Sequence, residues 1–118
     1  MINKICEVIK THEPSTSDPL VIVKGEKLVF EEKKTIYPGW IWCIKEDGKA
    51  GWVPKNYVKI SKNHCIALED YDAIELDVSI GERFKIEKEE SGWFWVSNKI
   101  GKIGWIPKEN VKIIEDLK

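Results

Sequence analysis

A tryptophan-rich stretch occurs twice in the chain. Residues 39–60 read GWIWCIKEDGKAGWVPKNYVKI, and residues 91–114 read SGWFWVSNKIGKIGWIPKENVKII. In both copies Trp-x-Trp is followed by Gly-Trp-[Val/Ile]-Pro, and corresponding tryptophans are 53 positions apart. A repeat of this length indicates two similar units, and it outweighs the single domain that a length of 118 residues alone would suggest. We therefore predict two domains, repeat 1 (residues 1–60) and repeat 2 (residues 61–118).

The similarity extends toward the N-terminus, with insertions in repeat 1. Gly25 corresponds to Gly81 at a shift of 56 positions, and Cys6 corresponds to Cys65 at a shift of 59. Each increase adds three residues to repeat 1, within residues 31–38 and 11–19, which are rich in Pro, Ser, Thr and Lys. Insertions of this composition predict loops at both places.

Between the loops the segments are short, rich in Val, Ile, Phe and Trp, and alternate in polarity, which is typical of β-strands. The pair Asp47 and Gly48 predicts a tight hairpin turn at 46–49. Because closure of a sheet removes exposed edges, about five short strands per repeat favour a small barrel. The predicted fold class is all-β, with two tandem antiparallel barrels packed against each other. In repeat 2 we predict strands at 65–68, 82–87, 93–98, 103–107 and 111–113.

Alternation also assigns the side chains of these strands to two faces. The smaller residues suit the crowded interior of a small barrel, and the tryptophans then face outward. The predicted inward residues are Ile41, Cys43, Phe94 and Val96, and the predicted outward residues are Trp40, Trp42, Trp93 and Trp95.

The overall composition disfavours several classes of function. A formal net charge of −1 and a pI near 6.1 favour neither nucleic acid nor an anionic membrane as a partner. The sequence has no apolar run near the ~20 residues that span a bilayer, and its N-terminus lacks the features of a signal peptide. We therefore expect a cytoplasmic protein.

The three cysteines are not arranged as a disulfide framework or as a C-x-x-C motif, so we expect reduced, buried thiols. A metal site built from Cys6, His12, His64 and Cys65 is disfavoured, because adjacent residues of a strand point to opposite faces and the spacing fits no zinc motif. No activated nucleophile is indicated either. We expect no catalysis, no metal and no cofactor.

The motifs in their order resemble the Src-homology-3 (SH3) domain. In repeat 2 the matching motifs are ALEDY at 67–71, EL at 75–76, IGE at 80–82, WF at 93–94 and GWIPKENV at 104–111. In repeat 1 they are KGE at 24–26, WI at 40–41 and GWVPKNYV at 51–58. The two matches cover nearly the whole chain and are similar to the variant SH3 domains of prokaryotic proteins. The resemblance implies an SH3-like barrel for each repeat.

The resemblance also implies a function, because SH3 domains bind extended proline-rich peptides on a groove lined with aromatic side chains. An indole face packed against proline offers a large contact area at a small entropic cost. The groove residues carried over to repeat 1 are Trp40, Trp52, Pro54 and Tyr57. Those carried over to repeat 2 are Tyr71, Trp93, Trp105 and Pro107.

Both repeats depart from the family pattern at groove positions. The first groove tyrosine is Lys10 in repeat 1 and Glu69 in repeat 2. The second is His12 in repeat 1 and is kept as Tyr71 in repeat 2, whereas the tyrosine of Asn-Tyr-Val is replaced by Asn110. Neither groove is complete within one repeat. A different peptide, or one groove shared between the repeats, therefore remains open.

Charge is distributed unevenly between the repeats, with a net charge of +2 through residue 60 and −3 beyond it. In the family, acids beside the groove pair with an Arg or Lys of the ligand. The resemblance thus implies that Asp72 and Glu75 contact a basic residue that flanks the peptide, and the alternative is a solvated acidic loop. The acids near this position are Glu69, Asp70, Asp72, Glu75 and Asp77.

The tryptophans have a second interpretation, which is packing. Trp42 and Trp95 have no groove role in the family, and only about six residues separate Val58 from Cys65. So short a connector does not let two domains tumble independently. Trp42 and Trp95 are therefore candidates for a contact between the repeats.

The sequence thus predicts a non-enzymatic adaptor that binds a protein or peptide segment, proline-rich with a basic flank. Three alternatives remain. One is a module that binds cell-wall peptidoglycan, and another is a small barrel that binds nucleic acid through the lysines of repeat 1. The third is a structural subunit whose tryptophans are buried in a homodimer.

Overall fold

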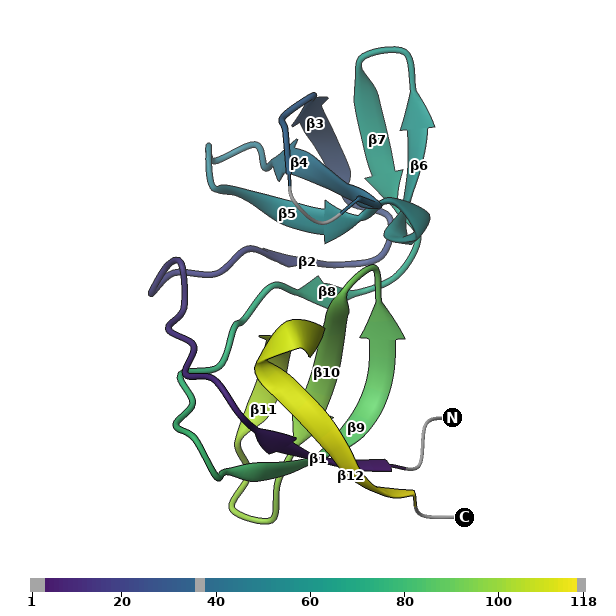
Figure 1. Cartoon of the computed structure of the whole chain (residues 1–118). Coiled ribbons are helices and arrows are strands. Elements are labelled where there is room, and N and C mark those ends of the chain that lie inside the picture. The colour runs from purple at the N-terminus through teal and green to yellow at the C-terminus, as the bar shows by residue number, and fades with distance from the viewer. Residues whose placement is uncertain (1–3, 36–37, 117–118) are drawn as a thin grey trace. The chain divides into compact units, whose positions relative to one another are not determined.

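The computed structural model describes residues 4–35 and 38–116 of the chain. Within these ranges the secondary structure consists of β-strands and two short 3-10 turns, without an α-helix (Figure 1). This confirms the all-β fold class. The strands are β1 (Lys4–Val8), β2 (Val21–Ile22), β3 (Lys27–Glu31), β4 (Trp40–Ile44), β5 (Ala50–Pro54), β6 (Val58–Ser61), β7 (His64–Ala67), β8 (Tyr71–Asp72), β9 (Arg83–Glu90), β10 (Trp93–Ser97), β11 (Ile103–Pro107) and β12 (Val111–Asp116), and the turns are η1 (Lys55–Tyr57) and η2 (Lys108–Asn110).

The strands predicted in repeat 2 are all present, as β7, β9, β10, β11 and β12. The predicted hairpin turn also forms between β4 and β5, where Gly48 has a φ of 91° and Asp47 accepts a hydrogen bond from the backbone N–H of Lys49.

No helix in the described ranges has the length and hydropathy to cross a membrane.

Two compact units make up the chain, and their boundaries differ from those of the two repeats. The continuous unit is Asp18–Ala73, and the split unit combines Met1–Ser17 with Ile74–Lys118. The division into 1–60 and 61–118 describes the repeated sequence, but it does not describe how the chain is grouped in space. The physical reason lies in the partners of the first strand of each repeat.

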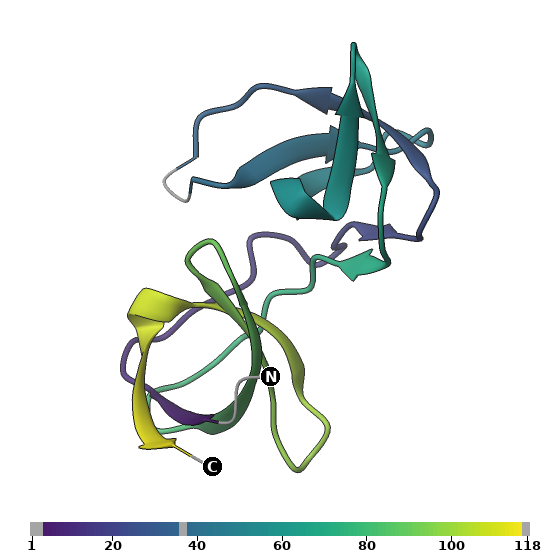
Figure 2. The same cartoon turned by 90° about the vertical axis from the view of Figure 1, so that its right-hand side faces the viewer.

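In the split unit, β1 lies between two strands of repeat 2. The sheet has the antiparallel order β11-β10-β9-β1-β12, so that β1 pairs with β9 on one side and with β12 on the other. Figure 1 shows β1 beside β12, and Figure 2 shows this sheet curling around its interior. The first strand of repeat 1 thus completes the sheet of repeat 2.

The continuous unit contains the reciprocal arrangement. Its five-stranded sheet has the antiparallel order β5-β4-β3-β7-β6, in which β7, the first strand of repeat 2, lies between two strands of repeat 1. A second, two-stranded sheet pairs β2 with β8. The repeats have therefore exchanged their first strands.

A short hairpin explains why β7 stays with repeat 1. Only Lys62 and Asn63 separate β6 from β7, and Ser61 pairs directly with His64. Closing so short a loop costs little chain entropy. The short connector, predicted to be a tether between two domains, is the turn of a hairpin inside one unit.

The hydrophobic cores show the same exchange. In the split unit Cys6 and Val8 from repeat 1 are fully buried among residues of repeat 2. The predicted inward residues Ile41, Cys43, Phe94 and Val96 are all buried, which confirms that side of the face assignment. The other members of the split unit's core are Leu76, Val78, Phe84, Ile86, Ile106 and Val111.

Each Gly-Trp-[Val/Ile]-Pro motif needs its glycine because another segment of the chain lies too close to leave room for a Cβ atom. A Cβ at Gly104 would lie 3.0 Å from the carbonyl oxygen of Ile74, and one at Gly51 would lie 3.0 Å from the Cβ of Leu20. In each unit a loop arm crosses its strand at this point. The motif therefore marks the place where the arm packs on β5 or β11.

Candidate functional site

The predicted site residues are divided between the two units. The continuous unit holds Trp40, Trp52, Pro54 and Tyr57, together with Tyr71 and Asp72 from repeat 2. The split unit holds Glu75, Trp93, Trp105 and Pro107. The boundary between Ala73 and Ile74 also divides the acidic run. Glu69, Asp70 and Asp72 belong to the continuous unit, whereas Glu75 and Asp77 belong to the split unit.

In the continuous unit the exchange brings two groove tyrosines together. Tyr57 follows β5 in η1, and Tyr71 lies in β8 on the arm that comes from repeat 2. Their rings meet edge to face, with centroids 5.4 Å apart, and the Tyr71 hydroxyl donates to the Trp52 carbonyl oxygen at 3.0 Å. The tyrosine missing from repeat 1 is thus supplied by repeat 2.

These aromatic residues are nevertheless buried. The exposed fractions are 3% for Tyr57, 6% for Tyr71 and 8% for Trp40, and Pro54 is fully buried. The expectation of an outward Trp40 is therefore wrong. Alternation places Trp40 on the face opposite Ile41, but it does not determine whether that second face meets water.

Two other tryptophans predicted to face outward, Trp42 and Trp95, form pairs across neighbouring strands. Trp42 meets Trp52 in the continuous unit, and Trp95 meets Trp105 in the split unit, each with ring centroids 5.2 Å apart. Lys33 Nζ lies 3.8 Å from the centroid of Trp42. Trp42 and Trp95 thus have aromatic partners within their own sheets, and their suggested role between the repeats stays a prediction.

Trp105 is also buried, with 2% of its surface exposed. The backbone hydrogen bonds of Trp105 show which segment covers it. The arm that follows the continuous unit forms a bridge with β11, in which Trp105 N–H donates to Ile74 and Leu76 N–H donates to Trp105. The arm therefore lies along this strand, which the sequence pattern alone did not indicate.

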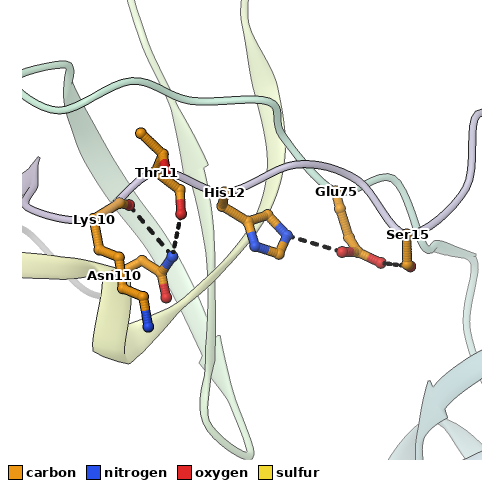
Figure 3. A network of polar contacts seen from close by, with 6 residues as sticks. All are labelled: Lys10, Thr11, His12, Ser15, Glu75 and Asn110. Atoms are coloured by element: carbon orange, nitrogen blue, oxygen red, sulfur yellow. Dashed lines mark hydrogen bonds and ion pairs between the residues drawn. The ribbon is translucent and has the colours of Figure 1, made fainter.

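The split unit has a different set of residues around Trp93, which is only partly buried. The His12 ring contacts Trp93 edge to face at 5.6 Å, and His12 Nε2 lies 2.9 Å from Glu75 Oε1. The hydroxyl of Ser15 donates to the other oxygen of Glu75 (Figure 3). His12 and Glu75 retain side-chain exposures of 18% and 19%. We call Trp93, His12, Glu75 and Ser15 the Trp93 surface.

A second polar contact fixes the same arm of repeat 1. Asn110 in η2 is buried, and its side-chain amide donates to the carbonyl oxygens of Thr11 at 3.0 Å and Lys10 at 3.3 Å (Figure 3). Asn110 occupies the position that Tyr57 has in the other unit. This departure from the family pattern therefore anchors Lys10 and Thr11 of the arm.

The cysteines are part of the cores. Cys6, Cys43 and Cys65 are all free and buried, and the Sγ atoms of Cys43 and Cys65 are 3.9 Å apart. Burial raises the pKa of Cys6 to about 11, and it also raises the pKa values of Cys43 and Cys65. Thiols of this kind are poor nucleophiles. Among the described residues no group of three His, Cys, Asp or Glu side chains is placed to hold a metal ion.

Comparison with known proteins adds one match. Residues 5–61 match the family model of the variant SH3 domain. No curated protein and no solved structure matched the chain. In space the matched segment is divided, because its first strand, β1, lies in the split unit and residues 18–61 lie in the continuous unit.

Proposed function

We propose that the chain is a non-catalytic adaptor that binds an extended peptide of a protein partner, because residues 5–61 match the family model of the variant SH3 domain, a type of protein-interaction module. We place the binding site on the Trp93 surface of the split unit. In the corresponding aromatic groove of the continuous unit, Trp40, Pro54, Tyr57 and Tyr71 are buried and only Trp52 is partly exposed, so little of that groove is open to a peptide. The poorly nucleophilic cysteines support a non-catalytic role in the reducing cytoplasm.

The observation that carries this proposal is the shared contact of His12 with Trp93 and Glu75. An indole and a carboxylate are thereby held within reach of the same imidazole. An arginine of the ligand can lie on the indole face and pair with the carboxylate in place of the exposed Ser15 hydroxyl. Proline residues of the peptide pack on the rest of the tryptophan ring. The proposed ligand is therefore proline-rich, with a basic residue at one end.

The test is a titration of the purified protein against a fluorescein-labelled peptide of this kind, read by fluorescence anisotropy. Small aromatic sites of this type give dissociation constants on the order of micromolar. We expect Trp93→Ala to weaken binding about tenfold or more, because it removes both the stacking area and the cation–π contact. We expect Glu75→Gln to weaken binding of the arginine peptide and to leave the matched peptide with alanine in place of arginine unchanged.

The matched control is Trp40→Ala, which removes the equivalent tryptophan of repeat 1. Since Trp40 is 8% exposed and Trp93 is only partly buried, Trp40→Ala should lower the melting temperature more than Trp93→Ala does. Wild-type affinity in a folded Trp93→Ala protein would refute a peptide site on the Trp93 surface.

A further inference from the structure

The Trp93 surface is built from two arms that lie far apart in the sequence. His12 and Ser15 precede the continuous unit, and Glu75 follows it. The His12 and Glu75 positions are separated by 63 residues, yet their side chains are 2.9 Å apart. The backbones of the arms are joined as well, because His12 and Val78 exchange hydrogen bonds of 3.3 and 3.0 Å. Everything between the arms is the continuous unit.

The continuous unit brings its own two ends together. Ala73 N–H donates to the Leu20 carbonyl oxygen at 2.9 Å, and β2 pairs with β8 just inside the two ends. When this unit is folded, the two arms of the split unit therefore leave it at neighbouring points. When it is unfolded, the arms are joined by a long flexible loop, and bringing them together costs the entropy of closing that loop.

The reverse dependence is different. The continuous unit is a single stretch of chain that contains all five strands of its sheet and both strands of the β2–β8 pair. No connection between its strands passes through the split unit. Unfolding of the split unit would break none of the strand pairings within this stretch, including the hairpin between β6 and β7.

We propose that the continuous unit acts as a clamp for the Trp93 surface: its folded state holds the two arms together, so a loss of its stability opens the split unit, whereas a loss of stability in the split unit leaves the continuous unit closed. This coupling follows from the path of the chain and does not rest on the proposed peptide ligand. It makes the continuous unit the element through which binding at the Trp93 surface can be regulated.

The chain offers a matched pair of residues for the test. Leu20 and Leu76 occupy equivalent positions in the two repeats, are 1% and 5% exposed, and lie in the continuous and the split unit, respectively. We would measure amide hydrogen exchange of the full chain by mass spectrometry in Leu20→Ala and Leu76→Ala. Peptides from β3 and β4 report on the continuous unit, and peptides from β1 and β9 report on the split unit.

We expect Leu20→Ala to reduce protection about tenfold or more in both units, and Leu76→Ala to reduce it in the split unit alone. If Leu20→Ala affects only the continuous unit, the clamp does not exist. If Leu76→Ala also deprotects the continuous unit, the two units unfold as one body and the one-way coupling is wrong. Should either alanine variant fail to fold, Ile22→Val and Ile86→Val provide the same comparison with the loss of a single buried methylene.

Discussion

At the scale of single residues, the glutamate of the Lys/Ile-Gly-Glu motif has a defined structural task in both repeats. Glu82 accepts hydrogen bonds from the backbone N–H of Ser79 at 2.6 Å and from Lys102 Nζ at 3.0 Å. Glu26 accepts from the backbone N–H of Val23 in the same way. Each carboxylate thus closes the turn that leads into β3 or β9. The motif was recognised in the sequence, but its carboxylate has a role in folding and none in the proposed binding surface.

The hydrogen bond from Ser79, with help from Lys102, lowers the pKa of Glu82 below its usual 4.5. A carboxylate whose pKa is lowered by folding stabilises the native state above its unfolded pKa, and this contribution disappears as the pH falls through the folded value. We expect Glu82→Gln to lower the melting temperature at pH 7 and to reduce the further loss of stability below about pH 4.5. Thermal melts from pH 7 to pH 3 measure both effects. The same melts of Glu46→Gln, at an exposed turn position, serve as the control, and an equal response of the two variants would show that the Ser79 contact contributes nothing.

At the scale of strands, the exchange between the repeats illustrates what a sequence pattern can and cannot specify. Alternation placed the strands of repeat 2 and identified inward residues such as Phe94 and Val96. It could not choose the partner of the first strand, because β1 and β7 occupy equivalent slots and each carries one fully buried cysteine, Cys6 or Cys65. The choice depends on chain connectivity. The one available signal was the short connector around Lys62 and Asn63, which favours a hairpin.

The same limit applies to the candidate site. Sequence motifs identify the groove residues individually. The contact between Tyr57 and Tyr71 depends on the strand exchange, and the sequence indicates it only through the open alternative of one groove shared between the repeats. In the sequence alone, His12 is only a departure from the family pattern. Its contact with Glu75 could not be predicted, because nothing in the local sequence brings residues 63 positions apart together.

The exchange makes a prediction that engineered disulfides can check. Glu7 stands directly opposite Lys112 in the pairing of β1 with β12. Lys59 is the equivalent of Lys112 in repeat 1 and stands opposite Ile66 instead. Cysteines at directly opposed positions of neighbouring strands have Cα atoms close enough for a disulfide. We therefore expect E7C/K112C to form an intramolecular disulfide under mild oxidation and E7C/K59C not to form one.

Intact mass and peptide mapping of the monomeric fraction would identify the bond. The native cysteines can remain, because their burial and raised pKa values make them slow to react. A disulfide in E7C/K59C with none in E7C/K112C would mean that each repeat keeps its own first strand.

At the scale of the whole molecule, the chain is one barrel-like unit inserted into a loop of another. The repeats suggested a positive first domain and a negative second one, but the continuous unit has nine lysines and nine acids, so its net charge is zero. The split unit then carries the net charge of −1 of the whole chain. The strong charge asymmetry between the repeats therefore does not carry over to the units. This weakens the basis for a basic, nucleic-acid-binding unit.

The insertion also predicts which piece of the chain folds by itself. Residues 18–73 contain the β6–β7 hairpin, the Tyr57–Tyr71 contact and the Cys43–Cys65 contact. Residues 1–60 lack β7, so they can complete the same sheet only with β1, whose Glu7 would then face a different set of neighbours. A unit of this size is marginally stable, burying only ~60% of its unfolded surface, so the loss of specific contacts should be readily measurable. We expect residues 18–73 to give a dispersed amide spectrum and a cooperative melt, and residues 1–60 to melt at a lower temperature. If residues 1–60 were instead the more stable piece, the sequence repeat would be the folding unit, and the exchanged strands would depend on the rest of the chain.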